Sequence, residues 1–134
     1  MSRASQPDYI LDASALVALM LGEPREAQVR DLLDRSYIHS INFAETAAAL
    51  ERAGIPRDEV AASLGQLRLR VDEEFSRQQA LACAALASRF GGSSLSLGDR
   101  VCLSVAESRG SFAVTADRRW SERTGIASPV QLIR

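Results

Sequence analysis

The chain has 134 residues, of which 46% are hydrophobic and 25% are charged, and its formal net charge at pH 7 is −1. This length suits one domain over residues 1–134, and the composition is that of a soluble globular protein rather than a disordered or membrane protein. The small net charge argues against binding nucleic acid through overall positive charge, so any contact with phosphates must be local.

Strand-like and helical segments alternate along the chain. In chain order, the sequence predicts a strand at 9–11, helices at 13–21 and 25–35, a strand at 37–39, helices at 41–53 and 56–67, a weak strand at 69–71, helices at 75–90 and 97–109, a strand at 112–115, a helix at 117–123 and a strand at 130–133. Short apolar strands separated by helices are typical of a parallel sheet that is covered on both faces. We therefore predict an α/β fold, a three-layer α/β/α sandwich with a mostly parallel sheet of about five strands.

The residue types that are missing restrict the chemistry. All sixteen basic residues are arginine, which excludes the phosphate-binding loop that needs lysine and excludes Schiff-base catalysis. The single histidine, His39, lies in a strand-like segment and is expected to be structural or exposed rather than catalytic. Cys83 and Cys102 lie in apolar helical patterns without paired spacing and are expected to be buried thiols, so a zinc site is excluded.

The sequence also predicts where the protein resides. No apolar segment reaches the roughly 18 residues that a membrane-spanning helix needs, and the N-terminal segment lacks the apolar core of a signal peptide. We therefore expect a cytoplasmic protein that does not enter a membrane.

Four acidic residues occur where strands give way to helices. Asp12 directly follows the strand at 9–11, Asp117 follows the strand at 112–115, Glu45 lies one turn into the helix after 37–39, and Asp99 opens the helix at 97–109. Ligands of parallel α/β sheets bind outside the carboxyl ends of the strands. We therefore expect these four carboxylates to converge on one site.

Helix capping is the alternative explanation for each acid. Asp12 and Asp117 have the position of N-caps, and the pairs Asn42/Glu45 and Ser96/Asp99 have the spacing of a capping box. Taken singly, each acid is better explained as a cap, and only the set of four favours a shared site.

Four carboxylates in one crevice predict a bound cation. Like charges at short distance raise each other's pKa, so the set needs a compensating charge to stay ionised. Mg²⁺, or Mn²⁺, prefers oxygen ligands and can activate water for phosphodiester hydrolysis without help from histidine or lysine. The missing residue types fit this chemistry.

Four segments in this order resemble the PIN-domain nucleases, and especially the VapC-type toxins of bacterial toxin–antitoxin pairs. They are YILDASALVALMLGEP, SINFAETAAALERAG, LSLGDRVCLSVAE and VTADRRW, and together they extend over nearly the whole chain. The resemblance implies a PIN-like sandwich and a metal-dependent ribonuclease. It also implies that Asp12, Glu45, Asp99 and Asp117 form the acidic site, with Asp12 and Asp99 as the firmest metal ligands.

Residues beside these acids extend the comparison with the family. Ser14 and Thr115 match small hydroxyl positions next to the site, whereas Thr46 and Ser104 stand where such sequences more often have an aliphatic residue and alanine. The last acidic position is the least uniform in the family, so Asp117 is interpreted as a direct ligand, as a residue acting through water, or as a cap.

Basic and aromatic residues near the acids have two interpretations each. Arg100, Arg118 and Arg119 are candidates for binding RNA phosphates, or they pair with neighbouring acids. Trp120 stacks on a base or, as we favour, packs in the core or an interface.

The resemblance also implies partners. These are an RNA substrate, a cognate antitoxin whose basic residue occupies the acidic pocket, and a second copy of the chain in a homodimer. The alternative function is a non-catalytic RNA-binding or regulatory module of the same fold, in which the acids serve only as caps.

Overall fold

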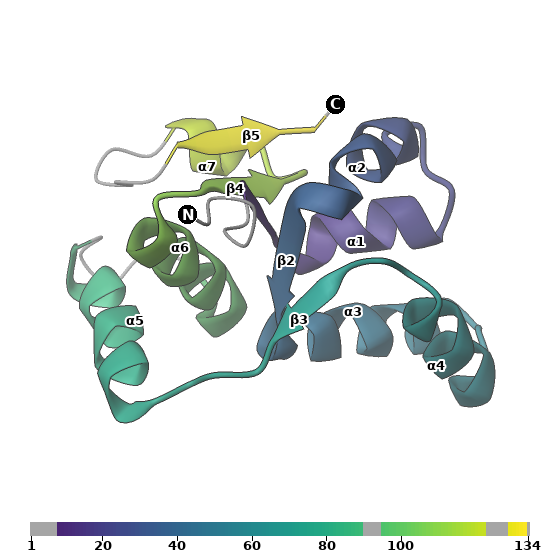
Figure 1. The fold of residues 1–134 in the computed structure, drawn as a ribbon, viewed down its shortest axis with the longest axis horizontal. Coiled ribbons are helices and arrows are strands. Elements are labelled where there is room, and N and C mark those ends of the chain that lie inside the picture. The colour runs from purple at the N-terminus through teal and green to yellow at the C-terminus, as the bar shows by residue number, and fades with distance from the viewer. Residues whose placement is uncertain (1–7, 90–94, 123–128, 134) are drawn as a thin grey trace.

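The computed structural model describes residues 8–89, 95–122 and 129–133 (Figure 1). Its elements are β1 (Tyr9–Leu11), α1 (Ala13–Met20), α2 (Glu26–Leu32), the 3₁₀ turn η2 (Leu33–Arg35), β2 (Ser36–His39), α3 (Ser40–Arg52), α4 (Arg57–Gly65), β3 (Arg70–Asp72), α5 (Arg77–Arg89), α6 (Leu97–Arg109), β4 (Phe112–Thr115), α7 (Arg119–Glu122) and β5 (Val130–Leu132). Every predicted element is present in the predicted order. The helix expected at 25–35 ends at Leu32 and continues as the 3₁₀ turn, and residues 90 and 123, also predicted to be helical, lie outside the described residues.

The five strands form one sheet in the order β3-β2-β1-β4-β5, and all four neighbouring pairs are parallel. The predicted three-layer α/β/α sandwich is confirmed. Leu11, the last residue of β1, is in register with Ile38 of β2 and Val114 of β4. The carboxyl ends of the three central strands therefore meet at one edge of the sheet.

Each face of the sheet is covered by its own helices. Figure 1 shows α1 to α4 on one side and α5 and α6 on the other. Successive residues of β1 divide between the two cores, because strand side chains alternate between faces: Leu11 packs with the α1–α4 layer and Ile10 with the α5–α7 layer. The second core contains Trp120, which is 1% exposed, so the expected packing role of this residue is confirmed.

Cys83 and Cys102 are buried free thiols in the α5–α7 core, as predicted. None of the helices in the described part of the chain combines the length and the apolar character needed to cross a membrane.

The start of α3 corrects one prediction. The helix begins at Ser40, and its N-cap is His39, whose Nδ1 accepts a hydrogen bond of 3.1 Å from the backbone N–H of Ile41. Because Nδ1 is the acceptor, Nε2 carries the hydrogen and donates to the Glu74 carbonyl at 2.8 Å. The capping box expected at Asn42 and Glu45 is therefore wrong, since the helix has already begun two residues earlier, whereas the structural role of His39 is confirmed.

Two of the other predicted caps are present. Asp12 is the N-cap of α1, and Ser96 and Asp99 form the capping box of α6. Both caps fix a carboxylate relative to the first turn of its helix, so capping does not exclude a second role for either acid.

Candidate acidic site

A pocket of about 340 Å³ opens at the carboxyl edge of the sheet. All four acids proposed from the sequence line it, although they come from four separate segments of the chain. Its lining residues are Asp12, Ala13, Ser14, Val17, Asn42, Glu45, Ala49, Arg52, Asp99 and Asp117. The acids meet because β1 and β4 are neighbours in the sheet and because α3 packs against α6 beside their ends.

Asp12 is the most enclosed of the four acids, with an exposed fraction of 5%. Its Oδ1 accepts hydrogen bonds from the Ser14 hydroxyl (2.7 Å) and the Ala15 backbone N–H (2.9 Å), and its Oδ2 accepts one from the Thr115 hydroxyl (2.5 Å). Burial raises the pKa of Asp12 from 3.8 to about 6, although these three hydrogen bonds act in the opposite direction. The fold therefore holds a poorly hydrated carboxyl group at the floor of the pocket.

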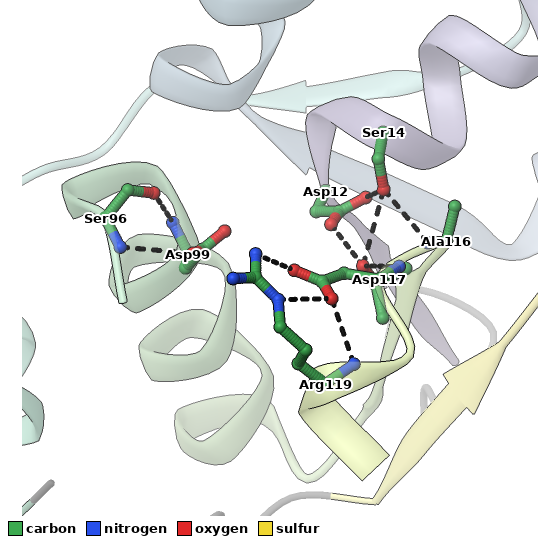
Figure 2. Close-up of polar contacts among 8 residues, drawn as sticks. Asp12, Ser14, Ser96, Asp99, Ala116, Asp117 and Arg119 are labelled. Carbon is green, nitrogen blue, oxygen red and sulfur yellow. Dashed lines mark hydrogen bonds and ion pairs between the residues drawn. The ribbon is translucent and has the colours of Figure 1, made fainter. Parts of the chain in front are cut away.

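Ser14 and Thr115 connect Asp12 to the segment that follows β4. The Ser14 hydroxyl accepts a hydrogen bond from the Ala116 backbone N–H (2.9 Å), and the Thr115 hydroxyl accepts one from the Asp117 N–H (3.0 Å). Each hydroxyl thus donates to Asp12 and accepts from a backbone N–H of the segment after β4. The two small residues fix β1 and the chain after β4 relative to each other. Figure 2 shows the contacts of Ser14 with Asp12 and Ala116.

Glu45 is held against the first turn of α6. The Asn42 side-chain amide donates to Glu45 Oε1 (3.3 Å) and to the Gly98 carbonyl (3.0 Å). A Cβ atom at Gly98 would stand 2.2 Å from Glu45 Oε1, so only glycine leaves room for this carboxylate. Partial burial there raises the pKa of Glu45, and the nearby charge of Asp99 acts in the same direction.

Asp99 is fixed by its own helix cap. Its Oδ2 accepts a hydrogen bond from the Ser96 backbone N–H, and its backbone N–H donates to the Ser96 hydroxyl, both at 3.1 Å. Both contacts are drawn in Figure 2. Asp99 also contributes to the raised pKa values of Asp12 and Glu45, which means that the three carboxylates sense one another electrostatically.

Asp117 is bound by the arginine two residues further on. Its Oδ1 accepts from the Arg119 backbone N–H (2.9 Å) and Nε (3.0 Å), and its Oδ2 accepts from Nη2 (2.8 Å). Of the two interpretations offered for Arg119, pairing with a neighbouring acid is therefore present.

The other two arginines proposed from the sequence lie near the acids but differ from Arg119. Arg100 is half-buried in α6, and its Nε has no hydrogen-bond partner among the described residues. Arg118 is exposed. Neither residue lines the pocket, so their proposed contact with RNA stays a prediction.

Three residues of the pocket region were missed in the sequence. Asn42 and Gly98 position Glu45 through a tertiary contact that no local pattern reveals. Arg52 lines the pocket and lies on the same face of α3 as Glu45 and Ala49, because these residues are spaced by four and then three positions. Helical periodicity could have found Arg52.

The donor set of the pocket fits a hard divalent cation. As placed in the described residues, no three Asp, Glu, His or Cys side chains form a ready cage for one ion. Mg²⁺ does not need such a cage, since it is commonly held by one or two carboxylates together with waters and substrate phosphate. The buried Asn42 Oδ1, which has no donor among the described residues, adds an unsatisfied oxygen to the carboxylate oxygens of the pocket.

A family comparison agrees with this geometry. A model of the PIN domain matches residues 9–126, a range that contains all four acids. The chain belongs to the PIN domain family. A comparison with curated protein sequences found no match.

Solved structures share the PIN fold over most of this chain. A toxin–antitoxin complex from Klebsiella pneumoniae has a TM-score of 0.71 at 18% identity, covering 92% of this chain and 96% of that one. DNA-bound VapBC from Salmonella typhimurium has a TM-score of 0.71 at 23% identity, with 93% and 97% coverage. VapC20 from Mycobacterium tuberculosis, a toxin that cleaves the sarcin–ricin loop, has a TM-score of 0.68 at 22% identity, with 89% and 96% coverage. At these identities the likeness shows the fold.

Proposed function

We propose that this PIN domain is a divalent-metal-dependent endoribonuclease that hydrolyses RNA phosphodiester bonds. One observation carries the proposal: carboxylates from four separate segments line a single pocket at the carboxyl edge of a parallel sheet. Capping alone explains Asp12 and Asp99 one at a time, but it does not explain why Glu45, which caps no helix, is held beside Asp99 by Asn42.

The proposed residues have distinct tasks. Asp12 and Asp99 would hold the ion, because each carboxylate is fixed by hydrogen bonds to neighbouring backbone or hydroxyl groups. Glu45 is the third candidate ligand, and the most exposed of these three carboxylates. Asp117 completes the acidic set, with Arg119 bound to it. Ser14 and Thr115 keep the Asp12 carboxylate oriented toward the pocket.

The expected cofactor is Mg²⁺, with Mn²⁺ as a substitute. When bound, such an ion supplies a Lewis acid that polarises the phosphoryl group and lowers the pKa of a water molecule. The chain itself contributes the negative charges that attract the ion and a narrow, partly desolvated floor around Asp12. Its single histidine is buried at the start of α3, so the carboxylates are the available proton acceptors in the pocket.

The biological setting that we propose is a toxin–antitoxin pair. Structural neighbours with TM-scores of about 0.7 are described as toxin–antitoxin or VapBC complexes, which supports an antitoxin partner for this chain. A basic residue of that antitoxin would occupy the acidic pocket through charge-assisted hydrogen bonds. We further propose that the toxin acts on RNA in the cytoplasm and forms a homodimer, since two-fold dimers are the commonest oligomers.

Asp99→Asn tests the proposed activity. The amide keeps an oxygen for the Ser96 cap but is a poorer ligand for a hard cation, so RNA cleavage with Mg²⁺ or Mn²⁺ should fall to background while the thermal unfolding midpoint changes little. Glu59→Gln, which removes an exposed carboxylate from α4, is the matched control and should cleave like the wild type. Equal cleavage by Asp99→Asn and the wild type would remove Asp99 from the mechanism.

A further inference from the structure

Arg119 is held beside the acidic pocket by Asp117, which lines it. The side chain and the backbone N–H of Arg119 together donate three hydrogen bonds to the same carboxylate, and the 2.8 Å contact from Nη2 is both one of these bonds and an ion pair. Figure 2 shows the guanidinium between the carboxylates of Asp117 and Asp99. The planar group is thus held in one orientation before any ligand arrives.

This arginine is tied to the floor of the pocket. The Asp117 backbone N–H donates to the Thr115 hydroxyl (3.0 Å), and that hydroxyl donates to Asp12 Oδ2 (2.5 Å). A short chain of hydrogen bonds therefore fixes the position of Asp117, and with it Arg119, relative to Asp12. A free surface arginine would have no such connection to the acidic site.

The guanidinium keeps donors for another anion. Of its five N–H hydrogens, Asp117 takes one from Nε and one from Nη2, and the Arg119 side chain is 69% exposed. Guanidinium groups bind phosphate through two parallel hydrogen bonds, so the remaining donors suit one phosphate of an RNA backbone.

We propose that Asp117 is a positioning residue: it holds Arg119 beside the pocket as a contact for an RNA backbone phosphate, and it does not bind the catalytic cation directly. The inference rests on the proposed nuclease function and assigns a division of labour within the same site. Asp12, Glu45 and Asp99 face the cation, while the Asp117–Arg119 pair faces the substrate.

Charge explains why the two roles separate. A divalent ion in direct contact with Asp117 would lie beside the guanidinium that already binds both oxygens of this carboxylate, and the two positive charges would repel. Arg119 also interacts electrostatically with Asp99, but its hydrogen bonds go to Asp117. No hydrogen bond or ion pair joins an arginine to Asp12, Glu45 or Asp99 among the described residues, so these carboxylates keep oxygens for an ion.

Two binding measurements test the inference. The affinity for Mn²⁺ is measured by titration calorimetry. The affinity for a short fluorescent single-stranded RNA is measured by fluorescence polarisation. The RNA measurement uses Ca²⁺ in place of Mg²⁺, and a gel confirms that the probe stays intact. The variants are Asp117→Asn, Arg119→Gln, the double variant and Arg119→Lys, with Asp99→Asn as the reference for loss of a metal ligand. Arg30→Gln, which removes one positive charge from an exposed ion pair on α2, is the matched control.

The inference predicts separate effects on the two ligands. Asp117→Asn and Arg119→Gln should each weaken RNA binding by about three- to tenfold, and the double variant should be no weaker than Arg119→Gln, because the two residues act as one unit. Their Mn²⁺ affinities should stay within about threefold of wild type, unlike that of Asp99→Asn. Arg119→Gln should also reduce the salt dependence of RNA binding by about 0.7 in log–log slope, whereas Arg119→Lys should keep it.

Three results would overturn the inference. One is a loss of Mn²⁺ affinity in Asp117→Asn as large as in Asp99→Asn, which would make Asp117 a ligand. Another is an Arg119→Gln variant that binds the RNA probe as Arg30→Gln does. The third is tighter Mn²⁺ binding by Arg119→Gln, which would make Arg119 a competitor of the ion. RNA cleavage by the wild-type protein is measured separately. If the wild type cleaves RNA and one of these three results is found, the inference fails while the proposed nuclease function stands.

Discussion

Asp12 and Glu45 reach the same pocket but are held there in different ways. Asp12 is 5% exposed and accepts three hydrogen bonds from neighbouring groups, whereas Glu45 is exposed and lies in a space that exists because Gly98 has no side chain. The Asp12 carboxylate is therefore constrained by desolvation and hydrogen bonds, and the Glu45 carboxylate by steric fit. Removing the charge of Asp12 should therefore disturb its half of the site, whereas adding one methyl group at Gly98 should disturb the position of Glu45.

Burial makes the ionisation of Asp12 costly. Because burial raises the pKa of Asp12 from 3.8 to about 6, keeping this group ionised in the folded, metal-free protein costs roughly 3 kcal/mol near pH 8. Burial also raises the pKa of Glu45, but this side chain is more exposed than that of Asp12, so its ionisation costs less. A bound cation would therefore offset the largest ionisation cost at Asp12.

Asp12→Asn should have the largest effect on activity. Cleavage is expected to fall to background, because the amide is a poor ligand for Mg²⁺, while the metal-free protein becomes more stable by about 1–3 kcal/mol near pH 8, because a desolvated charge is gone. Unfolding in the presence of EDTA measures the second effect. Added Mn²⁺ should stabilise the wild type and leave the variant unchanged. A variant that is less stable than wild type at pH 8 would contradict the burial argument.

Gly98→Ala should have the next largest effect and should act on the other half of the site. The added methyl group displaces the flexible Glu45 carboxylate rather than the helix backbone, so cleavage is expected to fall by about ten- to hundredfold. Stability should be unchanged or higher by up to about 1 kcal/mol, since alanine favours a helix more than glycine does. Gly65→Ala in α4, where a Cβ meets nothing within 4 Å, is the control. Full activity of Gly98→Ala would show that Glu45 is not needed in its present position.

The pH dependence should report on Asp12. A group whose folded pKa is raised contributes stability that is fully present below pH 3.8 and is lost as the pH rises through about 6. Stability of the metal-free protein should therefore decrease between pH 4 and about 7, while Mn²⁺ affinity should increase over the same range, because only the ionised carboxylate binds the ion. Calorimetric titrations and chemical unfolding at several pH values measure the two trends. Parallel rather than opposite trends would contradict the assignment.

Thr115→Val should give the smallest effect by shifting that pH profile. The Thr115 hydroxyl lowers the pKa of Asp12, so its removal should raise this pKa and move the midpoint of Mn²⁺ binding to higher pH. Loss of two buried hydrogen bonds, to Asp12 and from Asp117, should cost about 1–3 kcal/mol of folding stability. An unchanged midpoint would mean that Thr115 does not set the ionisation of Asp12.

The difference between the two halves also explains what the sequence could predict. Asp12 directly follows β1, Thr115 ends β4 and Asp117 lies two residues beyond it. Neighbouring parallel strands bring such positions together by their topology, so local patterns suffice. The support of Glu45 depends on Gly98, which is 53 positions away in the sequence and meets α3 only after the chain has folded. No hydrophobic pattern or cap motif in the sequence predicts the contact between Glu45 and Gly98.

Capping was predictable only where it follows the common motifs. Ser96 and Asp99 have the spacing of a capping box and form one, whereas α3 is capped by the imidazole of His39, a residue type that the usual cap preferences do not include. Asp117 and Arg119 are close in the sequence, but only the structure shows that three N–H groups of Arg119 donate to the same carboxylate.

The central claim is that Asp12, Glu45 and Asp99 form one cation site of a ribonuclease, with Asp117 bound to Arg119 beside it. Anomalous diffraction from crystals of the protein soaked in Mn²⁺, at the concentration that supports RNA cleavage, tests this most directly. The account predicts an anomalous peak in the pocket in contact with Asp12 and Asp99, with the Asp117–Arg119 ion pair still formed. A fully occupied Mn²⁺ site elsewhere, or an empty pocket under conditions of active cleavage, would contradict it.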